Sequence, residues 1–457
     1  MRKRLAFGIS IPIVLLFIGI IVAFLIPSNM FVLTDSLDRL GLLGGRAPIP
    51  GLVPVDGDVH SLVIVNGTLW DAEGGKRPNP GLAIRRGRFC AARDPGADSI
   101  DATGMTVLPG LIDMHVHSLG GRFAGEMMIG NGVTSARDLG THLEGVLALR
   151  RESETPSMGR SAGPRLFVTG PYLVSGMGAS DQEIGVPDPV SAAAVVERFA
   201  VAGTDGIKVH WGISAETLLA VIETAHRRGL WVAAHLDQVS ASEAARIGVD
   251  TIEHASGIDW GAGEDATRQA LEAMIARGVA LTPTLVVAEH AFTLPDLARA
   301  SNPLLAYFPS LLRRSWVASQ TANASAEHLD SGEIAARRER LEQIKRFTLR
   351  FHRAGGRVLA GTDAPAYLVA PGFDMHRELE LLVEAGLTPA EALDSATRQA
   401  AIALRRGREM GGLQPGMLAD LILVWGDPLS KDGGISATRN IVLDRRRVQL
   451  TPDRASQ

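Results

Sequence analysis

The sequence predicts an α/β protein: a (β/α)8 TIM barrel with a small β-sandwich domain, preceded by one transmembrane helix. Three observations favour this arrangement. Short apolar runs alternate with helical stretches through the middle of the chain, which is the pattern of βα units around a parallel sheet. Segments rich in β-forming residues lie before and after this region. An uncharged stretch near the N-terminus is long enough to cross a bilayer.

The composition fits a large globular chain. Its 457 residues, 46% of them hydrophobic, can bury a barrel core and a smaller second core. The 46 basic and 50 acidic residues nearly balance and form no long run of one sign, which argues against nucleic acid as a partner. The single cysteine, Cys90, excludes an internal disulfide and a cluster of thiolate ligands. Any metal ion must therefore be bound by histidines and carboxylates.

The N-terminus predicts a membrane anchor. Residues 1–4 form a basic flank, and the uncharged residues 5–26 follow it. At a rise of ~1.5 Å per residue, a helix of this length crosses a hydrocarbon layer of ~30 Å. The basic flank stays cytoplasmic by the positive-inside rule. The rest of the chain is therefore expected outside the cytoplasm, in the periplasm or the extracellular space.

A cleaved signal peptide, and hence a secreted protein, is the alternative interpretation. The apolar region of a signal peptide usually spans only ~7 to 15 residues and ends at a small-residue cleavage site. Pro27, Ser28 and Asn29 follow the apolar stretch here. Its length favours a single-pass anchor in the lipid bilayer. Residues 27–58 are rich in proline and glycine and are expected to form a linker.

Two β-rich segments flank the barrel and are expected to pair into one β-sandwich. The first covers residues 59–108, with strand-like runs at 62–65 and 82–85. The second covers residues 411–451 and follows the helix-rich region, with runs at 419–424 and 441–448.

The barrel itself is predicted for residues 109–410. Its eight strands are expected at residues 110–115, 133–137, 165–169, 206–210, 230–235, 251–254, 280–285 and 357–363. Helices are expected between or after them, at residues 189–202, 215–228 and 389–404. Residues 290–354 exceed what one crossover needs, so they are expected to form extra helices, either as a lid over the barrel mouth or as surface decoration.

Polar side chains recur at the carboxyl ends of the predicted strands, the face on which barrel enzymes build their active sites. The candidate metal ligands are His115, His117, His235, His254 and Asp363. His115 and His117 are two residues apart, so both imidazoles point to one side of an extended chain and can chelate one metal ion.

The alternation of side chains also bears on the other three candidates. Trp231 and Ala233 share the parity of His235, and Ile252 shares that of His254, so both histidines can face inward. Asp363 follows Gly361 with the same parity, which leaves space for a carboxylate beside a metal ion. Each histidine alone would more often be a hydrogen-bonded core residue. In this order on successive strands, they indicate a catalytic metal site.

Lys208 lies in an apolar strand, where a free ammonium group is costly to bury. If carbon dioxide adds to its amine, the product is a carbamate anion that can bridge two metal ions. Two divalent ions carry four positive charges, and the carbamate, Asp363 and a hydroxide supply three negative charges. The site is then nearly neutral. The alternative is a lysine that extends its amine to the surface.

His210 shares the parity of Lys208 and is a candidate substrate-binding residue. A packing role for this imidazole is the alternative.

The sequence resembles the amidohydrolase superfamily, specifically the group related to imidazolonepropionase and the metal-dependent Xaa-Pro dipeptidases. The matching motifs cover most of the chain. They are Leu-Pro-Gly-Leu-Ile-Asp at 108–113 leading into His115 and His117, Gly-Val-Thr-Ser-Ala-Arg-Asp-Leu-Gly at 132–140, Gly-Thr-Asp-Ala at 361–364, Glu-Leu at 378–379, Glu-Ala-Gly-Leu-Thr-Pro at 384–389 and Gly-Met-Leu-Ala-Asp-Leu at 416–421.

The resemblance implies a (β/α)8 barrel with a β-sandwich and a pair of metal ions. In such enzymes the residues matching His115, His117 and Asp363 hold one ion, those matching His235 and His254 hold the second, and the modified lysine, here Lys208, bridges them. Imidazolonepropionase works with one metal ion and lacks that lysine, so Lys208 favours the dipeptidase-like branch. Residues 171–180 depart from the pattern, because Ser-Gly-Met-Gly at 175–178 replaces the Gly-Gly-His of many relatives.

These residues predict a hydrolase that acts on carbon–nitrogen bonds. A metal-bridging hydroxide is expected to attack the amide of a dipeptide or an N-acyl amino acid, with Asp363 as the general base. Zinc suits histidine and oxygen ligands, as do manganese and cobalt. A lactonase or phosphotriesterase with the same binuclear site is the alternative. A deaminase and a membrane-tethered binding protein without catalysis are weaker alternatives.

Overall fold

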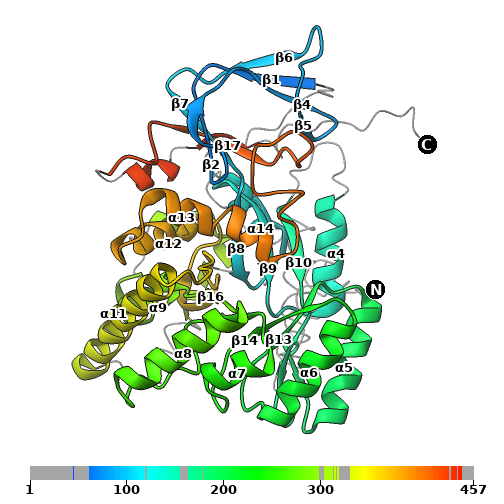
Figure 1. The fold of residues 1–457 in the computed structure, drawn as a ribbon, viewed down its shortest axis with the longest axis vertical. Helices are drawn as coiled ribbons and strands as arrows, with labels where there is room; N and C mark the ends of the chain where they lie inside the picture. Colours follow the sequence, from blue (N-terminus) through cyan, green and yellow to red (C-terminus); the bar gives the residue numbers. More distant parts are fainter. Residues whose placement is uncertain are drawn as a thin grey trace, which may run out of the picture.

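The computed structural model describes most of the chain from residue 61 onward (Figure 1). The described residues are 45, 61–118, 121–154, 163–178, 180–297, 303–311, 313–314, 316–318, 330–431, 434–439 and 441–444. The predicted anchor at 5–26 and nearly all of the predicted linker lie outside these residues. Within the described part of the chain, no helix is both long enough and apolar enough to cross a bilayer.

Seven short parallel strands build most of the barrel. They are β8 (Leu111–Val116), β9 (Val133–Asp138), β10 (Arg165–Val168), β13 (Gly206–Val209), β14 (Trp231–Ala234), β15 (Thr251–Glu253) and β16 (Ala280–Thr282). Hydrogen-bonded ladders join β8 to β9 and β9 to β10, and β13 through β16 in order. The Asp205 N–H donates to the Val168 carbonyl at 2.8 Å and connects the end of β10 to the start of β13. The positions agree with the predicted strands, although most observed strands end one or more residues earlier.

The eighth predicted strand, residues 357–363, is an extended segment rather than a continuous strand. Isolated parallel bridges connect Val358 to Leu281 on one side and Ala364 to Val116 on the other. This segment therefore closes the ring between β16 and β8. Asp363 interrupts the strand geometry because its φ of 62° lies in the left-handed region, outside the β range.

Helices cover the outside of the strands, as Figure 1 shows for α5 to α8 beside β13 and β14. They are α3 (Gly121–Gly130), α4 (Leu143–Glu154), α5 (Pro189–Ala202), α6 (Ala215–Arg227), α7 (Ala241–Ile247), α8 (Glu264–Arg277) and α12 (Phe373–Glu384). The bounds of α5 are those predicted. Asp188 caps this helix by accepting a hydrogen bond from the Ser191 N–H, and Pro189 occupies its first turn.

The prediction of a single helix at 389–404 is wrong. Two short helices form instead, α13 (Pro389–Ser395) and α14 (Arg398–Ala403). Thr397 between them has φ −133° and ψ −92°, which is not helical. The break turns the Ala396 carbonyl toward β8, where it accepts a hydrogen bond from the Ile112 N–H at 2.7 Å. A long-range contact with the barrel thus replaces the local helical bond.

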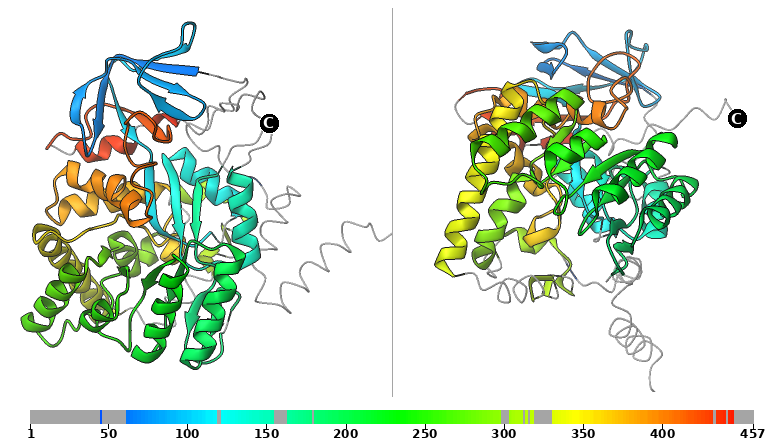
Figure 2. Two further views of the ribbon diagram at one scale, coloured as in Figure 1. Left: turned by 45° about the vertical axis from the view of Figure 1, so that its right-hand side comes forward. Right: turned by 60° about the horizontal axis from the view of Figure 1, so that its bottom comes forward.

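Two small sheets form the flanking domain, which lies beside the barrel in all views (Figures 1 and 2). One sheet has the order β5-β4-β1-β6 and the other β18-β17-β7-β2-β3. Their strands are β1 (Ser61–Val65), β2 (Thr68–Asp71), β3 (Gly75–Pro78), β4 (Leu82–Arg85), β5 (Arg88–Cys90), β6 (Asp98–Asp101), β7 (Met105–Pro109), β17 (Leu421–Trp425) and β18 (Ile441–Asp444). β7 pairs antiparallel with β17, so the two segments that flank the barrel share one sheet as predicted. A separate hydrophobic core that includes Ile64, Val107 and Leu423 fills the space between the sheets.

The predicted insertion at 290–354 adds helices to one side of the barrel. The described part contains most of α9 (Leu285–Leu297), η2 (Pro303–Tyr307) and α11 (Ser331–Arg353), and α11 packs against α9. A further addition follows β10: β11 (Tyr172–Val174) pairs with β12 (Glu183–Gly185) and, at Leu173, with β13. The sequence analysis did not predict this small pair.

Candidate active site

A cavity of about 800 Å³ lies at the carboxyl ends of the barrel strands. Such a volume is within the range of small-molecule sites, ~300 to 1,000 Å³. All seven residues singled out in the sequence line it: His115, His117, Lys208, His210, His235, His254 and Asp363. They lie in or directly after four strands, β8, β13, β14 and β15, and in the closing segment, so the barrel itself brings them together.

His115, His117 and Asp363 form the tightest group. The Asp363 carboxylate lies 3.1 Å from Nε2 of His117 and 3.3 Å from Nε2 of His115. One ligand atom from each residue lies within 4.8 Å of the other two, so the group could hold a metal ion. The Asp363 N–H donates to the His115 carbonyl at 2.7 Å, which fixes the closing segment against β8.

Gly361 permits this close approach. A Cβ at this position would lie 2.6 Å from a methyl carbon of Thr282 and 2.9 Å from the backbone nitrogen of His115. The absent side chain of Gly361 thus makes room for Thr282 and His115, rather than for the Asp363 carboxylate as the sequence analysis expected. Asp113 supports the same contact, because its buried carboxylate accepts hydrogen bonds from the backbone N–H groups of His115 and Thr362.

His254 reaches the cavity by a route that strand alternation does not predict. Ile252 packs in the hydrophobic cluster outside the strands with Val232 and Leu281, whereas Glu253 points into the barrel. His254 would then face outward, and the parity argument for it is wrong. Its φ of 59° breaks the alternation and turns the side chain inward. The Thr284 hydroxyl lies 2.6 Å from Nδ1 of His254.

His235 completes a row of imidazoles. Its ring centre lies 4.7 Å from that of His254 and 4.2 Å from that of His210, and His254 is 4.7 Å from His115. Trp231 and Ala233, which share its parity, pack in a cluster with Phe167 and Leu359. Ala234 packs instead in the outer cluster. The parity argument for His235 is therefore consistent with the packing.

Burial keeps most of these imidazoles neutral. It lowers the pKa of His235 to about 4, and it lowers the pKa values of His115 and His254 well below the usual value. Lys208 adds to the effect in all three. A neutral imidazole presents a lone pair, which is the form that binds a metal ion.

Lys208 is buried inside the barrel with 1% of its surface exposed. Its Nζ has no hydrogen-bond partner within the described part of the chain. Burial lowers the pKa of the Lys208 amine to about 8, although Glu253 and Asp363 oppose this shift. A buried, unpartnered amine is costly unless another group satisfies it.

His210 lies between the row of imidazoles and the rim. Its ring centre is 4.8 Å from that of Tyr172 and 4.3 Å from that of Trp211. Burial, together with His235 and Lys208, lowers the pKa of His210, so its ring is neutral. These contacts are compatible with packing and with substrate contact.

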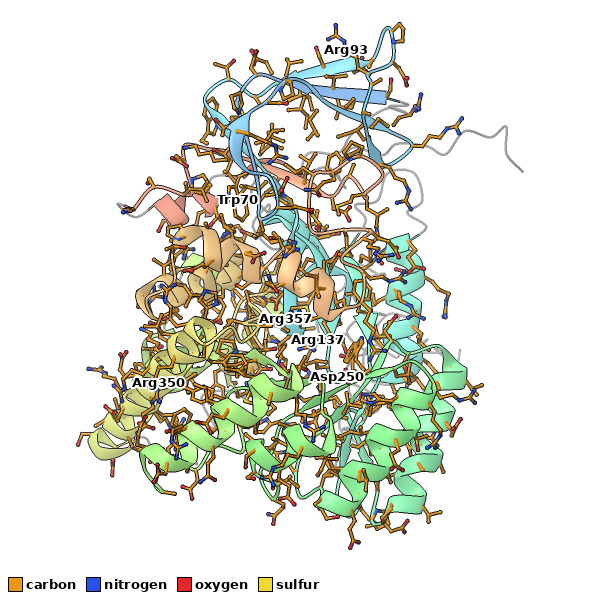
Figure 3. The ribbon with its side chains drawn as sticks, viewed as in Figure 1. Trp70, Arg93, Arg137, Asp250, Arg350 and Arg357 are labelled. Atoms are coloured by element: carbon orange, nitrogen blue, oxygen red, sulfur yellow. The ribbon has the colours of Figure 1, made fainter. Side chains whose placement is uncertain are left out.

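The sequence analysis missed Glu253 as a site residue and gave Arg137 no role. Arg137 lies among the barrel strands (Figure 3), and its guanidinium donates to Glu253 at 2.8 Å. Glu253 is fully buried, and its second oxygen lies 2.9 Å from Nδ1 of His115. The sequence pointed to both residues, because Glu253 immediately precedes the candidate ligand His254 and Arg137 lies in the family motif at 132–140.

Comparisons with known proteins agree with this geometry. The sequence model of the amidohydrolase family matches residues 106–448. An imidazolonepropionase from Geobacillus sp. (strain WCH70) is 24% identical over 427 residues, covering 85% of this chain and 90% of that protein. The fold is similar to that of a Xaa-Pro dipeptidase with bound methionine, with a TM-score of 0.64, 23% identity, and coverage of 83% of this chain and 97% of that one. A prolidase complexed with N-methylphosphonate-L-proline also has a similar fold, with a TM-score of 0.65 and 21% identity, and the match covers 86% of this chain and 99% of that one.

Proposed function

The chain belongs to the amidohydrolase family, and we propose that it hydrolyses the C–N amide or peptide bond of a small substrate of the dipeptide or N-acyl amino acid type. One observation carries the proposal: imidazoles, a carboxylate and an unpartnered amine line a single cavity. The two peptidase structures with a similar fold support the choice of an amide substrate.

The donor set fits a pair of divalent metal ions. His115, His117 and Asp363 would hold one ion, and His235 and His254 would hold the other. Zinc is our first choice, because imidazole and oxygen ligands suit it. When bound, such ions polarise a carbonyl oxygen and lower the pKa of water toward ~7.

Lys208 fits a bridging position after it reacts with carbon dioxide. The nitrogen lone pair of its neutral amine forms a bond to the carbon of carbon dioxide, and one proton leaves to solvent. The product is a carbamate with one negative charge. A pKa of about 8 leaves an appreciable neutral fraction of the amine near neutral pH, which favours this reaction. Conversion to an anion would also remove the cost of a buried, unpartnered ammonium group.

Asp363 is the proposed general base. Burial raises its pKa, but the neighbouring His115 and His117 lower it by more, so the carboxylate is ionised and can accept a proton. It would take a proton from the attacking water and pass it to the nitrogen of the departing amine. His210 is proposed to contact the substrate beside Tyr172 and His235.

A substrate panel tests the proposal, run on purified full chain with measured metal content. We expect two metal ions per chain and faster hydrolysis of dipeptides or N-acyl amino acids than of lactones or organophosphates. A preference for lactones or organophosphates would assign the same site to a lactonase or phosphotriesterase. Absence of metal and of turnover would indicate a binding protein instead.

A further inference from the structure

One wall of the cavity is formed by α11 and by the loop after β15. Arg340 and Ile344 of α11 line it, together with Ile258 and Trp260 of the loop. Among the described residues that line the cavity, Arg340 is the only charged side chain outside the cluster of histidines, Lys208 and Asp363. The other three side chains of this wall, Ile258, Trp260 and Ile344, are apolar or aromatic.

Arg340 differs from other basic residues of α11 in its electrostatic partners. Arg337 pairs with Glu333 at 3.0 Å, and Lys345 pairs with Glu384 at 2.9 Å. No carboxylate of the described chain lies within ion-pair distance of Arg340. Partial burial lowers its pKa, as expected for a cation without a neighbouring carboxylate, but a guanidinium stays charged.

Trp260 orients the guanidinium without neutralising it. The Arg340 guanidinium carbon lies 5.2 Å from the centre of the Trp260 ring, and Trp260 in turn contacts Phe347 edge to face. A cation–π contact of this kind leaves the N–H donors at the edge of the guanidinium free for an anion. These donors match the two oxygens of a carboxylate.

The two ends of the cavity differ in depth. Arg340 is exposed, whereas His115 and Lys208 at the catalytic end are each 1% exposed. Most other lining side chains are apolar or aromatic, including Phe123, Phe308 and Trp316. A ligand that contacts both ends therefore needs an apolar middle part.

We propose that Arg340 binds a carboxylate of the substrate at the opening of the cavity. The inference rests on the proposed function and narrows its substrate class. The preferred substrate is an amide in which an apolar body separates the scissile bond from a free carboxylate. The amide lies at the buried end, the apolar body lies along the wall of Ile258, Trp260 and Ile344, and the carboxylate pairs with Arg340.

Mono-anilides of linear dicarboxylic acids, with acyl chains from four to ten carbons, test this inference. Each free acid is compared with its terminal carboxamide as a substrate of the metal-loaded full chain. Wild type should prefer the free acid about tenfold or more in kcat/KM, mainly through KM, and one chain length should be best. In Arg340→Met, the ratio of the two kcat/KM values should fall to about one.

Arg338→Met is the matched control. Arg338 is on the same helix and also lies over an aromatic ring, Phe292, at 5.5 Å, but it does not line the cavity. This variant should keep the preference for the free acid. The inference is overturned if wild type shows no preference, or if Arg340→Met retains it.

The carboxylate site can also be tested separately from the proposed hydrolase function. If wild type hydrolyses neither compound, calorimetry with the mono-anilide of octanedioic acid and with its carboxamide still measures carboxylate binding. Tighter binding of the free acid by wild type than by Arg340→Met supports the carboxylate site even without turnover. Equal binding of both compounds by wild type overturns it.

Discussion

Asp363 has the geometry for two roles at the residue scale, as a metal ligand and as a general base. Its left-handed backbone conformation and the bond from its N–H to the His115 carbonyl hold the carboxylate against both histidines of β8. An asparagine keeps one ligand oxygen and nearly the same shape, but it cannot accept and return a proton. Substitution by asparagine can therefore separate the two roles.

We expect Asp363→Asn to retain substantial metal and to lose most turnover, by a factor of ~10² to 10⁴ in kcat, the usual contribution of a general base. Elemental analysis and steady-state kinetics measure the two effects. Asp101→Asn is a suitable control, because Asp101 is exposed, lies in β6 of the flanking domain and accepts hydrogen bonds from Asn66 and Thr103. Near-normal turnover of Asp363→Asn would refute the proposed proton transfer.

Glu253 determines which nitrogen of His115 carries the proton. Burial raises the pKa of Glu253, but Arg137 and Lys208 lower it by more, so the residue is an anion. An anion beside Nδ1 favours a proton on that nitrogen and leaves the lone pair of Nε2 directed toward Asp363. Glu253 is therefore a positioning residue, which acts on the proposed metal site through His115.

Glu253→Gln should weaken metal binding by ~10- to 100-fold, as is usual when the partner of a metal-binding histidine is lost. The amide can place its NH2 group against Nδ1 of His115 and favour the wrong tautomer. Competition with a chelator measures the affinity, and ¹⁵N NMR of histidine reports the tautomer. Thr251→Val removes a 2.6 Å hydrogen bond to the other oxygen of Glu253 and should leave the affinity nearly unchanged. Equal losses in both variants would indicate a general structural effect.

The sequence identified most of the candidate site residues, but it did not identify the buried charged residues that contact them. Spacing and strand ends were enough to place His115, His117, His235 and Lys208 in one cavity. His254 was found for an incorrect reason, because its positive φ reverses the alternation on which the prediction relied. Glu253 and Arg137 were missed because their partners are distant in sequence, and one sequence does not show which buried charges meet.

At the scale of elements, Glu378 connects α12 to the start of α9. Its carboxyl group is fully buried and accepts a hydrogen bond from the Val286 N–H at 2.8 Å, and its other oxygen has no partner in the described part of the chain. Burial raises the pKa of Glu378 from 4.5 to about 8. The folded protein therefore binds a proton here that the unfolded chain has released.

This linkage predicts the pH dependence of stability. Between pH ~4.5 and ~8 the folded state binds more protons at Glu378. The contribution of Glu378 to the free energy of unfolding therefore falls as pH rises, by about 5 kcal/mol in total, and levels off above pH ~8. Glu378→Gln should remove this fall. Relative to wild type, the variant should gain stability between pH 5 and pH 8, as measured by chemical denaturation.

Glu380→Gln, on the same helix, is the control for Glu378→Gln. Burial raises the pKa of Glu380, but the ion pair with Arg439 lowers it by more, so the sign of the linkage is reversed. This variant should lose stability relative to wild type above pH ~4.5. If Glu378→Gln shows no gain in stability relative to wild type between pH 5 and pH 8, Glu378 is not protonated in the folded protein.

The order of elements was predictable from the sequence because hydrophobic patterning is local. The ends of the elements were harder to predict. The predicted helix at 389–404 breaks where the Ala396 carbonyl accepts a hydrogen bond from β8. The predicted strand at 357–363 is held to its neighbours only by isolated bridges. Both departures come from contacts with distant residues. Hydrophobic patterning gives no information on such contacts, so the helices and strands predicted from it are too long or too continuous.

At the scale of the whole molecule, the residues that would hold the proposed metal ions come from β8, β14, β15 and the closing segment, which lie far apart in the sequence. Binding to the folded state alone would stabilise it by mass action. Removal of metal with a chelator should therefore abolish turnover and lower the melting temperature, and zinc with bicarbonate should restore both. Restoration of turnover without bicarbonate, in carbon dioxide-free buffer, would count against the carbamate on Lys208.

We propose that residues 5–26 anchor the catalytic domain outside the cytoplasm. The predicted linker at 27–58 separates this segment from the first strand of the described structure, so a chain that begins at residue 59 keeps the barrel and the flanking domain. Full-length protein expressed in a Gram-negative host should sediment with membranes and resist extraction at alkaline pH. Protease added to intact spheroplasts should reach its catalytic domain.

The chain that begins at residue 59 should remain in the supernatant with the same kcat/KM. A signal peptide predicts a different outcome for the full-length protein: a shortened mature chain, detectable by mass, that is released without detergent. Recovery of an intact full-length chain in the soluble fraction would contradict both interpretations, because an uncharged stretch of this length is expected either to stay in the bilayer or to be removed.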